Sequence, residues 1–224
     1  MIDGPPLPEA LEALPIFPLP GVQLFPCTLL PLHIFEPRYR AMTRDALGGA
    51  RLIGVTMLEP GHEDEDERDG PPAVRRQCGG GRIVQSHLHP DGRYDILLRG
   101  IGRVRILDEL PPTALYRTVR ARRLDDPAPT PAVAAEQQAL IALCDRLAGS
   151  LPSGGETLRE LVRQERGAGA ACDVVASALL TEPAERQEVL ETLDVATRIQ
   201  RVCDAVVALL ARFGGLHGSG AGPN

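Results

Sequence analysis

Prolines at positions 15, 18, 20 and 26 constrain the fold of the first apolar segment more than any other feature of this chain. The segment reads LPIFPLPGVQLFPCTLLPLHIF over residues 14–35. A proline inside a helix removes a backbone hydrogen bond and clashes with the preceding turn, so a helix is excluded here. Proline also removes a donor from a central strand. We therefore predict short strands or extended segments near sheet edges over 16–19 and 29–34.

The residues that follow predict more strands around one helix. Pro37 suits a first helical position, and Tyr39, Met42 and Ala46 share one helical face. Apolar or alternating runs predict further strands, with a hairpin turn between the second and third of them. These runs cover residues 52–58, 82–89, 94–99, 104–106 and 116–122. The predicted fold class is α+β, with about six strands and one inserted helix in a curled, partly closed antiparallel sheet.

The pattern changes at DDPAPTP, residues 125–131, and helical periodicity follows. We expect helices over 130–148, 157–166 and 170–180, a fourth that opens at Pro183, and a last one capped by Asp194 and ended by Gly214-Gly215. The predicted organisation is a flexible N-terminus over 1–13, a sheet subdomain over 14–123, a linker over 124–131, a helical bundle over 132–213 and a disordered tail over 214–224.

All 24 basic residues of the 224-residue chain are arginine. Without lysine there is no P-loop ammonium, no Schiff base and no Ser-Lys dyad, because guanidinium cannot replace a titratable amine. The five cysteines are scattered and contain no C-x-x-C pair, so we interpret them as small buried residues. No apolar run approaches the ~20 residues of a membrane helix, and the first residues lack a signal-peptide pattern. We expect a cytoplasmic protein that needs no cofactor.

One cluster of side chains resembles a catalytic constellation: His33, Glu36, Arg38 and Tyr39. Glu36 beside Pro37 is placed to cap the helix, Arg38 to pair with a carboxylate and Tyr39 to pack beneath. We interpret the cluster as a determinant of the fold. Nowhere does the sequence bring together a nucleophile, a base and an orienting group, so we expect no catalytic residue.

Two other patterns suggest metal ions. His87 and His89 are two apart and project from one face of a predicted strand, which is an acceptable spacing for metal ligands. No third ligand lies nearby in the sequence, so we expect a solvated strand face and no metal. The acidic run at 63–69, within the acidic loop 59–72, lacks the residue order of a calcium loop.

Three stretches carry a resemblance to a known family. They are LFPCTLLPLHIFEPRYRAM at 24–42, DGRYDILLRGIGRVRIL at 91–107 and ERQEVLETLDVATRIQRV at 185–202. In this order they resemble the N-terminal, substrate-binding domain of the Lon protease, over roughly residues 14–213. The signature residues, which we interpret as structural, are His33, Phe35, Glu36, Pro37, Arg38 and Tyr39. One departure is Cys27, where many relatives have glycine.

The resemblance implies a PUA-like β-barrel followed by a helical bundle. The family's domain engages client polypeptides in Lon and forms part of a ubiquitin-ligase receptor in cereblon. For this chain, the resemblance implies a non-catalytic module that binds unfolded or extended polypeptides. It also implies a role as an adaptor in protein quality control, beside a separate ATP-dependent protease. The expected contact residues are apolar and lie in the proline-rich segment: Phe17, Leu19, Val22, Leu24, Phe25 and Leu29.

The alternative is RNA binding. Residues 71–123 carry 11 arginines and 4 acids, and PUA-like barrels bind RNA elsewhere. The arginines that would form this face are Arg117, Arg120, Arg122 and Arg123. A net charge of −6 and only 3% aromatic residues argue against it, because acidic flanks repel a phosphate backbone and few rings are available for stacking.

Overall fold

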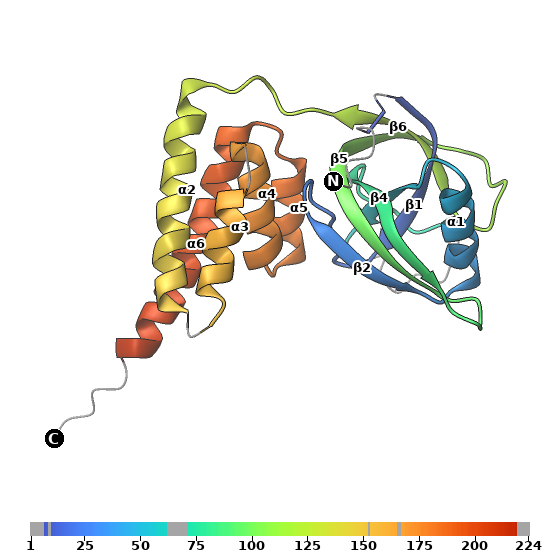
Figure 1. The fold of residues 1–224 in the computed structure, drawn as a ribbon. Coiled ribbons are helices and arrows are strands. Elements are labelled where there is room, and N and C mark those ends of the chain that lie inside the picture. Colours follow the sequence, from blue (N-terminus) through green and yellow to red (C-terminus); the bar gives the residue numbers. More distant parts are fainter. Residues whose placement is uncertain (1–6, 9, 62–70, 152, 165–166, 219–224) are drawn as a thin grey trace. The chain divides into compact units, whose positions relative to one another are not determined.

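The computed structural model describes residues 7–8, 10–61, 71–151, 153–164 and 167–218. The chain divides into two compact units, one of residues 1–125 with 182–191, the other of residues 126–181 with 192–224. The first unit contains all six strands (Figure 1). Their bounds are β1 Ala10–Leu19, β2 Leu29–Ile34, β3 Leu52–Met57, β4 Gln77–Leu88, β5 Tyr94–Glu109 and β6 Thr118–Leu124. Helix α1, Pro37–Gly48, is inserted between β2 and β3.

The strands form one mixed sheet in the order β2-β5-β4-β3-β1-β6, with an additional β5–β6 ladder. That ladder pairs β6, the last strand of the order, with the long strand β5, which also pairs with β2 and β4, so the sheet curls back on itself. The α+β class and the six strands around one inserted helix are confirmed. The sheet is not the wholly antiparallel barrel that we expected, because β1 and β3 are parallel. Parallel neighbours require a long crossover, which β2 and α1 supply here.

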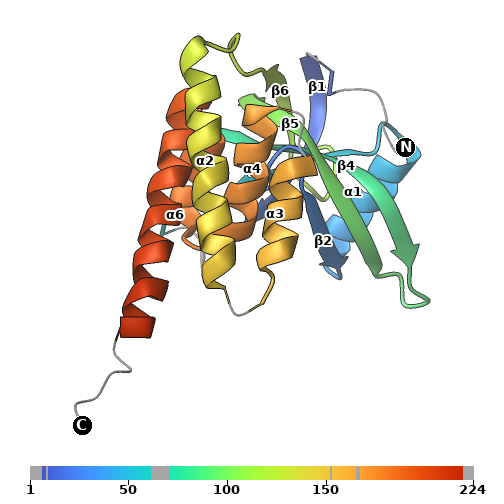
Figure 2. The same cartoon turned by 60° about the vertical axis from the view of Figure 1, so that its left-hand side comes forward.

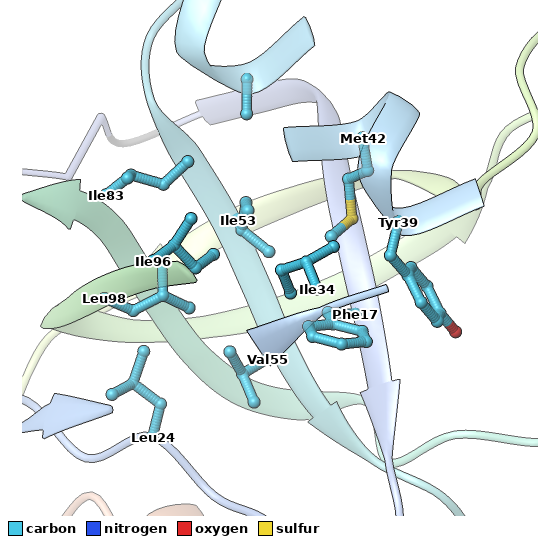
Figure 3. Close-up of a cluster of buried hydrophobic side chains, with 11 residues drawn as sticks. Phe17, Leu24, Ile34, Tyr39, Met42, Ile53, Val55, Ile83, Ile96 and Leu98 are labelled. Carbon is cyan, nitrogen blue, oxygen red and sulfur yellow. The ribbon is translucent and has the colours of Figure 1, made fainter. Parts of the chain in front are cut away.

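The first core cluster lies between the sheet and α1 (Figure 3). Tyr39, Met42 and Ala46 project from one face of α1 into it, as their spacing predicted. They pack against apolar side chains from the sheet and from the segment between β1 and β2. These are Phe17, Leu24, Ile34, Ile53, Val55, Ile83, Ile96 and Leu98. A helix with one apolar face thus covers part of a sheet with one apolar face.

We expected a flexible region over 1–13, of which residues 1–6 and 9 lie outside the described part of the chain; residues 7–8 and 10–13 differ from this expectation. Strand β1 begins at Ala10 and pairs with β6, with Leu11 opposite Ala121. Leu7 and Leu11 are buried in a second core cluster with Val104 and Ile106. The prolines of this segment exclude a helix, but its leucines supply enough apolar surface to hold the chain on the sheet.

Glycines let the segment between β1 and β2 pass directly over the sheet. A Cβ at Gly79 would lie 1.9 Å from the backbone oxygen of Leu24, and one at Gly100 would lie 1.9 Å from that of Phe25. Only glycine permits so close an approach of two backbones. The crossing segment is fastened by hydrogen bonds between Cys27 and Gly100 and between Gly100 and Thr28, each 2.9 Å long. Leu24 and Phe25 are consequently buried.

The second unit contains the helices α2 Pro131–Ser150, α3 Gly155–Gln164, α4 Ala168–Leu179 and α6 Val195–Gly218. Figure 2 shows α2 and α6 side by side, with α3 and α4 packed against them. Their starts agree with the expected helices to within two residues. Helix α6 continues through Gly214-Gly215, where we expected its end, because glycine lowers helix propensity without forbidding a helix. None of the helices in the described part of the chain has the length and apolarity of a membrane span.

Helix α5, Pro183–Glu191, belongs to the first unit and not to the expected bundle over 132–213. The side chain of Arg103 in β5 donates to the backbone oxygen of Leu190 at 2.9 Å. The side-chain amide of Gln187 donates to the backbone oxygen of Gln77 in β4 at 2.9 Å. These hydrogen bonds to the strands join α5 to the sheet.

Candidate functional site

An apolar groove lies between the end of β1, the start of α1 and the connection from β5 to β6. Its volume is about 460 Å³. The lining residues come from four separate stretches of the chain. They are Pro18, Arg38, Tyr39, Pro71, Glu109, Leu110, Pro112, Ala114, Leu115, Tyr116, Arg117 and Thr118. This volume lies within the roughly 300–1,000 Å³ of typical ligand pockets.

Aromatic rings and prolines make the walls of the groove. The rings of Phe17 and Tyr39 pack with their centroids 4.3 Å apart. The guanidinium of Arg38 lies 4.5 Å from the centroid of the Tyr39 ring, and it forms a 2.9 Å ion pair with Glu36. Burial raises the pKa of Tyr39 above its ordinary value. Tyr39 is therefore a neutral, packed surface at physiological pH.

The connection from β5 to β6 supplies the exposed apolar side of the groove. Leu115 is 71% exposed, the highest fraction among the exposed large apolar side chains. Next to it, the hydroxyl of Tyr116 donates to Asp45 in α1 at 3.1 Å. Tyr116 also lines a second hollow of about 370 Å³, between β1 and the end of α1. Leu115 therefore projects from a loop that Tyr116 fastens to α1.

The charged groups at the groove are paired. Arg117 makes two hydrogen bonds of 2.7 Å to the carboxylate of Glu109, and donates to the backbone oxygen of Pro72 at 2.8 Å. Two parallel bonds between guanidinium and carboxylate are a strong, geometrically fixed pair. With Arg38 paired to Glu36 as well, the groove offers apolar surface and little net charge.

The structure removes three of the six expected contact residues from the surface. Phe17, Leu24 and Phe25 are core residues, because Phe17 of β1 packs against Tyr39 and the segment that carries Leu24 and Phe25 crosses over the sheet. Leu19 and Val22 are half-buried, and Leu29 is exposed on β2. Apolar composition alone did not distinguish a contact surface from a core.

We did not predict this groove from the sequence. Pro111-Pro112 indicates a break between the expected strands 104–106 and 116–122, and Leu115 and Tyr116 follow it within four residues. An apolar residue and an aromatic residue inside a proline-containing connection were the available signal. The other walls come from residues that are distant in the sequence, which no spacing rule brings together.

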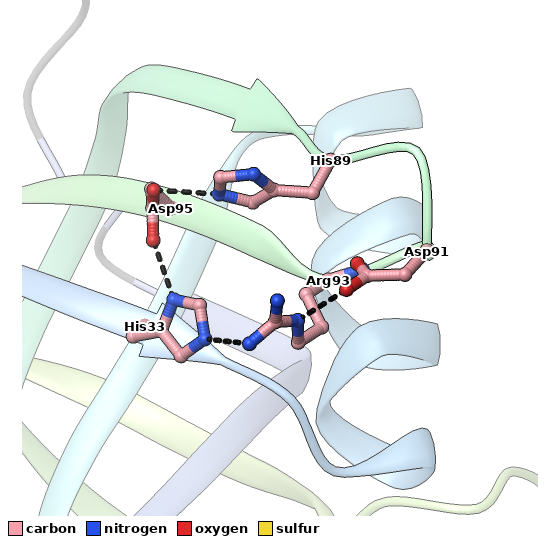
Figure 4. A network of polar contacts seen from close by, with 5 residues as sticks. All are labelled: His33, His89, Asp91, Arg93 and Asp95. Carbon is pink, nitrogen blue, oxygen red and sulfur yellow. Dashed lines mark hydrogen bonds and ion pairs between the residues drawn. The ribbon is translucent and has the colours of Figure 1, made fainter.

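The signature residues divide between core and surface. Tyr39 is buried and Pro37 begins α1, as expected. Glu36 precedes the helix, but its side chain makes no capping hydrogen bond; it pairs with Arg38 instead. His33 and Phe35 are exposed, and the His33 ring lies beside Asp95 of β5 (Figure 4).

The expected nucleic-acid face has most of its charge neutralised. Arg117 pairs with Glu109, Arg120 with Glu12 and Asp108, and Arg123 with Asp125. Arg122 is exposed on β6. Ion pairs of this kind reduce the positive potential that would attract a phosphate backbone.

The model of the ATP-dependent protease La (LON) substrate-binding domain family matches residues 13–208. The chain belongs to this family. It is 29% identical over 192 residues to a Lon protease of Dictyoglomus thermophilum, and 30% identical over 197 residues to one of Roseiflexus castenholzii. These alignments cover 85% and 87% of the chain. The chain spans 24% of the length of each of these relatives.

Two solved structures share the Lon-type fold. The N-terminal domain of the Mycobacterium avium complex Lon protease aligns with a TM-score of 0.69 at 17% identity, over 88% of this chain and 98% of that one. The Lon N-terminal domain protein from Xanthomonas campestris aligns with a TM-score of 0.60 at 20% identity, over 87% and 98%. The expected family and its α+β fold are thereby confirmed.

Proposed function

We propose that this Lon-family chain binds unfolded or extended polypeptides through the groove at Leu115. The observation that carries the proposal is the apolar groove, whose exposed wall is a leucine and whose charged groups are already paired. Free energy is released when apolar side chains of a client cover such a surface, because apolar area on both sides is removed from water. The paired charges do not favour a phosphate group. Membership of a substrate-binding domain family supports the same class of ligand.

The proposed role ends with binding. The chain would hold a client polypeptide or pass it to a separate ATP-dependent protease, as an adaptor in protein quality control. Apolar contacts would supply most of the affinity, so binding would change little with salt. RNA binding through the arginines of β6 would behave in the opposite way, because each phosphate contact releases counterions.

The test measures the affinity for a labelled, permanently unfolded polypeptide, such as reduced and carboxymethylated α-lactalbumin, across a salt series. Leu115→Ser removes the exposed apolar wall and should weaken binding by about tenfold to a hundredfold, since burying a leucine contributes about 1.5–3 kcal/mol and 1.4 kcal/mol is tenfold.

The matched control is Leu88→Ser. Leu88 is also exposed, at 57%, but it lies at the end of β4 and does not line the groove. Equal losses in both variants, or binding to single-stranded RNA that collapses with salt while polypeptide binding is absent, would contradict the proposal.

A further inference from the structure

Strand pairing gathers imidazoles and a carboxylate on one face of the β2-β5-β4 part of the sheet. His33 of β2 lies opposite Asp95 of β5, and Asp95 lies opposite His87 of β4. Directly opposed residues in a sheet project from the same face. His89 follows β4 at the start of the hairpin turn. Its backbone N–H donates to the backbone oxygen of Arg93 at 2.8 Å. His33 and Asp95, the partners of His89 that the sequence did not reveal, thus come from strands β2 and β5.

The donor atoms of three of these residues converge (Figure 4). Nδ1 of His33 lies 2.6 Å from one oxygen of Asp95, and Nε2 of His89 lies 2.7 Å from the other. One ligand atom from each residue lies within 4.8 Å of the other two. In a tetrahedral zinc site with bonds of about 2.0–2.1 Å, ligand atoms are about 3.3 Å apart. Small side-chain rotations at this exposed position suffice to reach that spacing.

The neighbouring side chains fix the protonation of the group. Nη1 of Arg93 lies 3.2 Å from Nε2 of His33. A guanidinium only donates, so this nitrogen accepts, and the proton of the neutral ring resides on Nδ1 and points to Asp95. Hydrogen bonds from His33 and then from His89 hold the pKa of Asp95 below its usual value. The carboxylate is therefore ionised at neutral pH.

We propose that His33, His89 and Asp95 bind a divalent transition-metal ion of the zinc class, which fastens the edge strand β2 to the β4–β5 hairpin. Two imidazoles and one carboxylate are a ligand set that zinc accepts, with water in the remaining position. The ion takes the place of the two protons that now lie between the imidazoles and the carboxylate, and each neutral ring then carries its proton on its other nitrogen, so that no proton is released overall. Nε2 of His33 then carries the ring proton, and Arg93 retains its 2.7 Å pair with Asp91.

The test uses the full chain after removal of metal with a chelator. Calorimetry with Zn²⁺ should give one ion per chain, and Co²⁺ should give the visible absorption of a tetrahedral site. His33→Ala, His89→Ala and Asp95→Asn should each weaken binding at least tenfold. Substitution of a residue that only hydrogen-bonds a metal ligand already lowers metal affinity by roughly tenfold or more, and these residues are the ligands themselves. All three side chains lie at the surface, and circular dichroism verifies that each variant is folded.

The matched control is Asp108→Asn, which makes the same substitution on the same strand at an exposed aspartate outside the cluster. It should bind Zn²⁺ like the wild type. Zn²⁺ should also raise the thermal unfolding midpoint of the wild type and of Asp108→Asn, but not that of Asp95→Asn. Binding that survives all three ligand substitutions, a cobalt spectrum with thiolate charge-transfer bands, or the lack of stoichiometric binding would overturn the proposal.

Discussion

Among single residues, Cys27 has a backbone conformation that its side chain disfavours. Its φ is 64°, in the left-handed region, at the point where the crossing segment hydrogen-bonds to Gly100. A non-glycine residue in this region carries a cost of about 1–2 kcal/mol. The resemblance had indicated glycine in many relatives at this position, and the conformation gives a physical reason for it.

We therefore expect Cys27→Gly to raise the free energy of unfolding by about 1 kcal/mol, after the added flexibility of glycine in the unfolded chain is subtracted. Urea denaturation measures the change. Cys27→Ala is the control, because it removes the thiol and keeps the Cβ; it should give no gain. Equal stabilisation by both substitutions would show that the thiol and not φ is responsible.

Arg198 is the largest charged side chain in the interior of the second unit, with none of its surface exposed. Its guanidinium bonds Asp126 at 2.8 and 2.6 Å and forms a 3.3 Å ion pair with Asp173, which is also buried. The removal of one member of a buried network leaves the other charges without compensation.

Arg198→Leu should lower the free energy of unfolding by about 3–5 kcal/mol in urea denaturation. The control is Arg201→Leu, an exposed arginine three residues further along the same helix, which should cost no more than about 1 kcal/mol. A loss at Arg198 as small as that at Arg201 would contradict the network. The sequence did not reveal this network, because its three members are far apart in the chain.

Among the elements, helix α6 has the N-cap that the sequence predicted. The backbone N–H and the hydroxyl of Thr197 both donate to Asp194, at 2.9 and 2.7 Å. The Thr197 hydroxyl first, and then its N–H, lower the pKa of Asp194 below the ordinary value. In the unfolded chain this carboxyl has a pKa of about 3.9. Its stabilisation is therefore complete above that pH and is lost as the pH falls through the lower, folded value.

We expect Asp194→Ala to lower the thermal unfolding midpoint at neutral pH, because two donors of the first turn lose their acceptor. The difference from wild type should shrink as the pH falls below about 4. Asp194→Asn keeps a capping oxygen at every pH and serves as the control. A difference between Asp194→Ala and wild type that does not change with pH would contradict the role of the charge.

Elements with regular periodicity were predictable, and those selected by tertiary contacts were not. The apolar face of α1 and the starts of α2 and α4 follow from local spacing. Strand β4 begins at Gln77, five residues before the expected start, because Gly79–Gly81 show no alternation. Gly79 and Gly81 are required by the close passage of Leu24, which lies far away in the sequence.

For the whole molecule, the sequence indicated two parts that divide within residues 124–131, but it did not indicate that residues 182–191 return to the first part. Helix α5 joins the sheet unit through hydrogen bonds such as that from Arg186 to Gln23, at 3.0 Å. In the sequence, however, α5 comes between α4 and α6, which belong to the other unit. The acidic loop falls largely on residues 62–70, outside the described part of the chain. The groove likewise depends on Pro18, Tyr39 and Leu115, which only the folded chain brings together.

The central claim, that polypeptides bind at the groove, is tested most directly by hydrogen exchange of the unmodified protein with and without an unfolded polypeptide. The account predicts slower exchange over residues 110–117 and the first turns of α1, with little effect of salt. Slower exchange confined to β2 would indicate addition of a strand at the sheet edge, and slower exchange confined to β6 would indicate the arginine face. Either of these results, with the groove unchanged, would contradict the account.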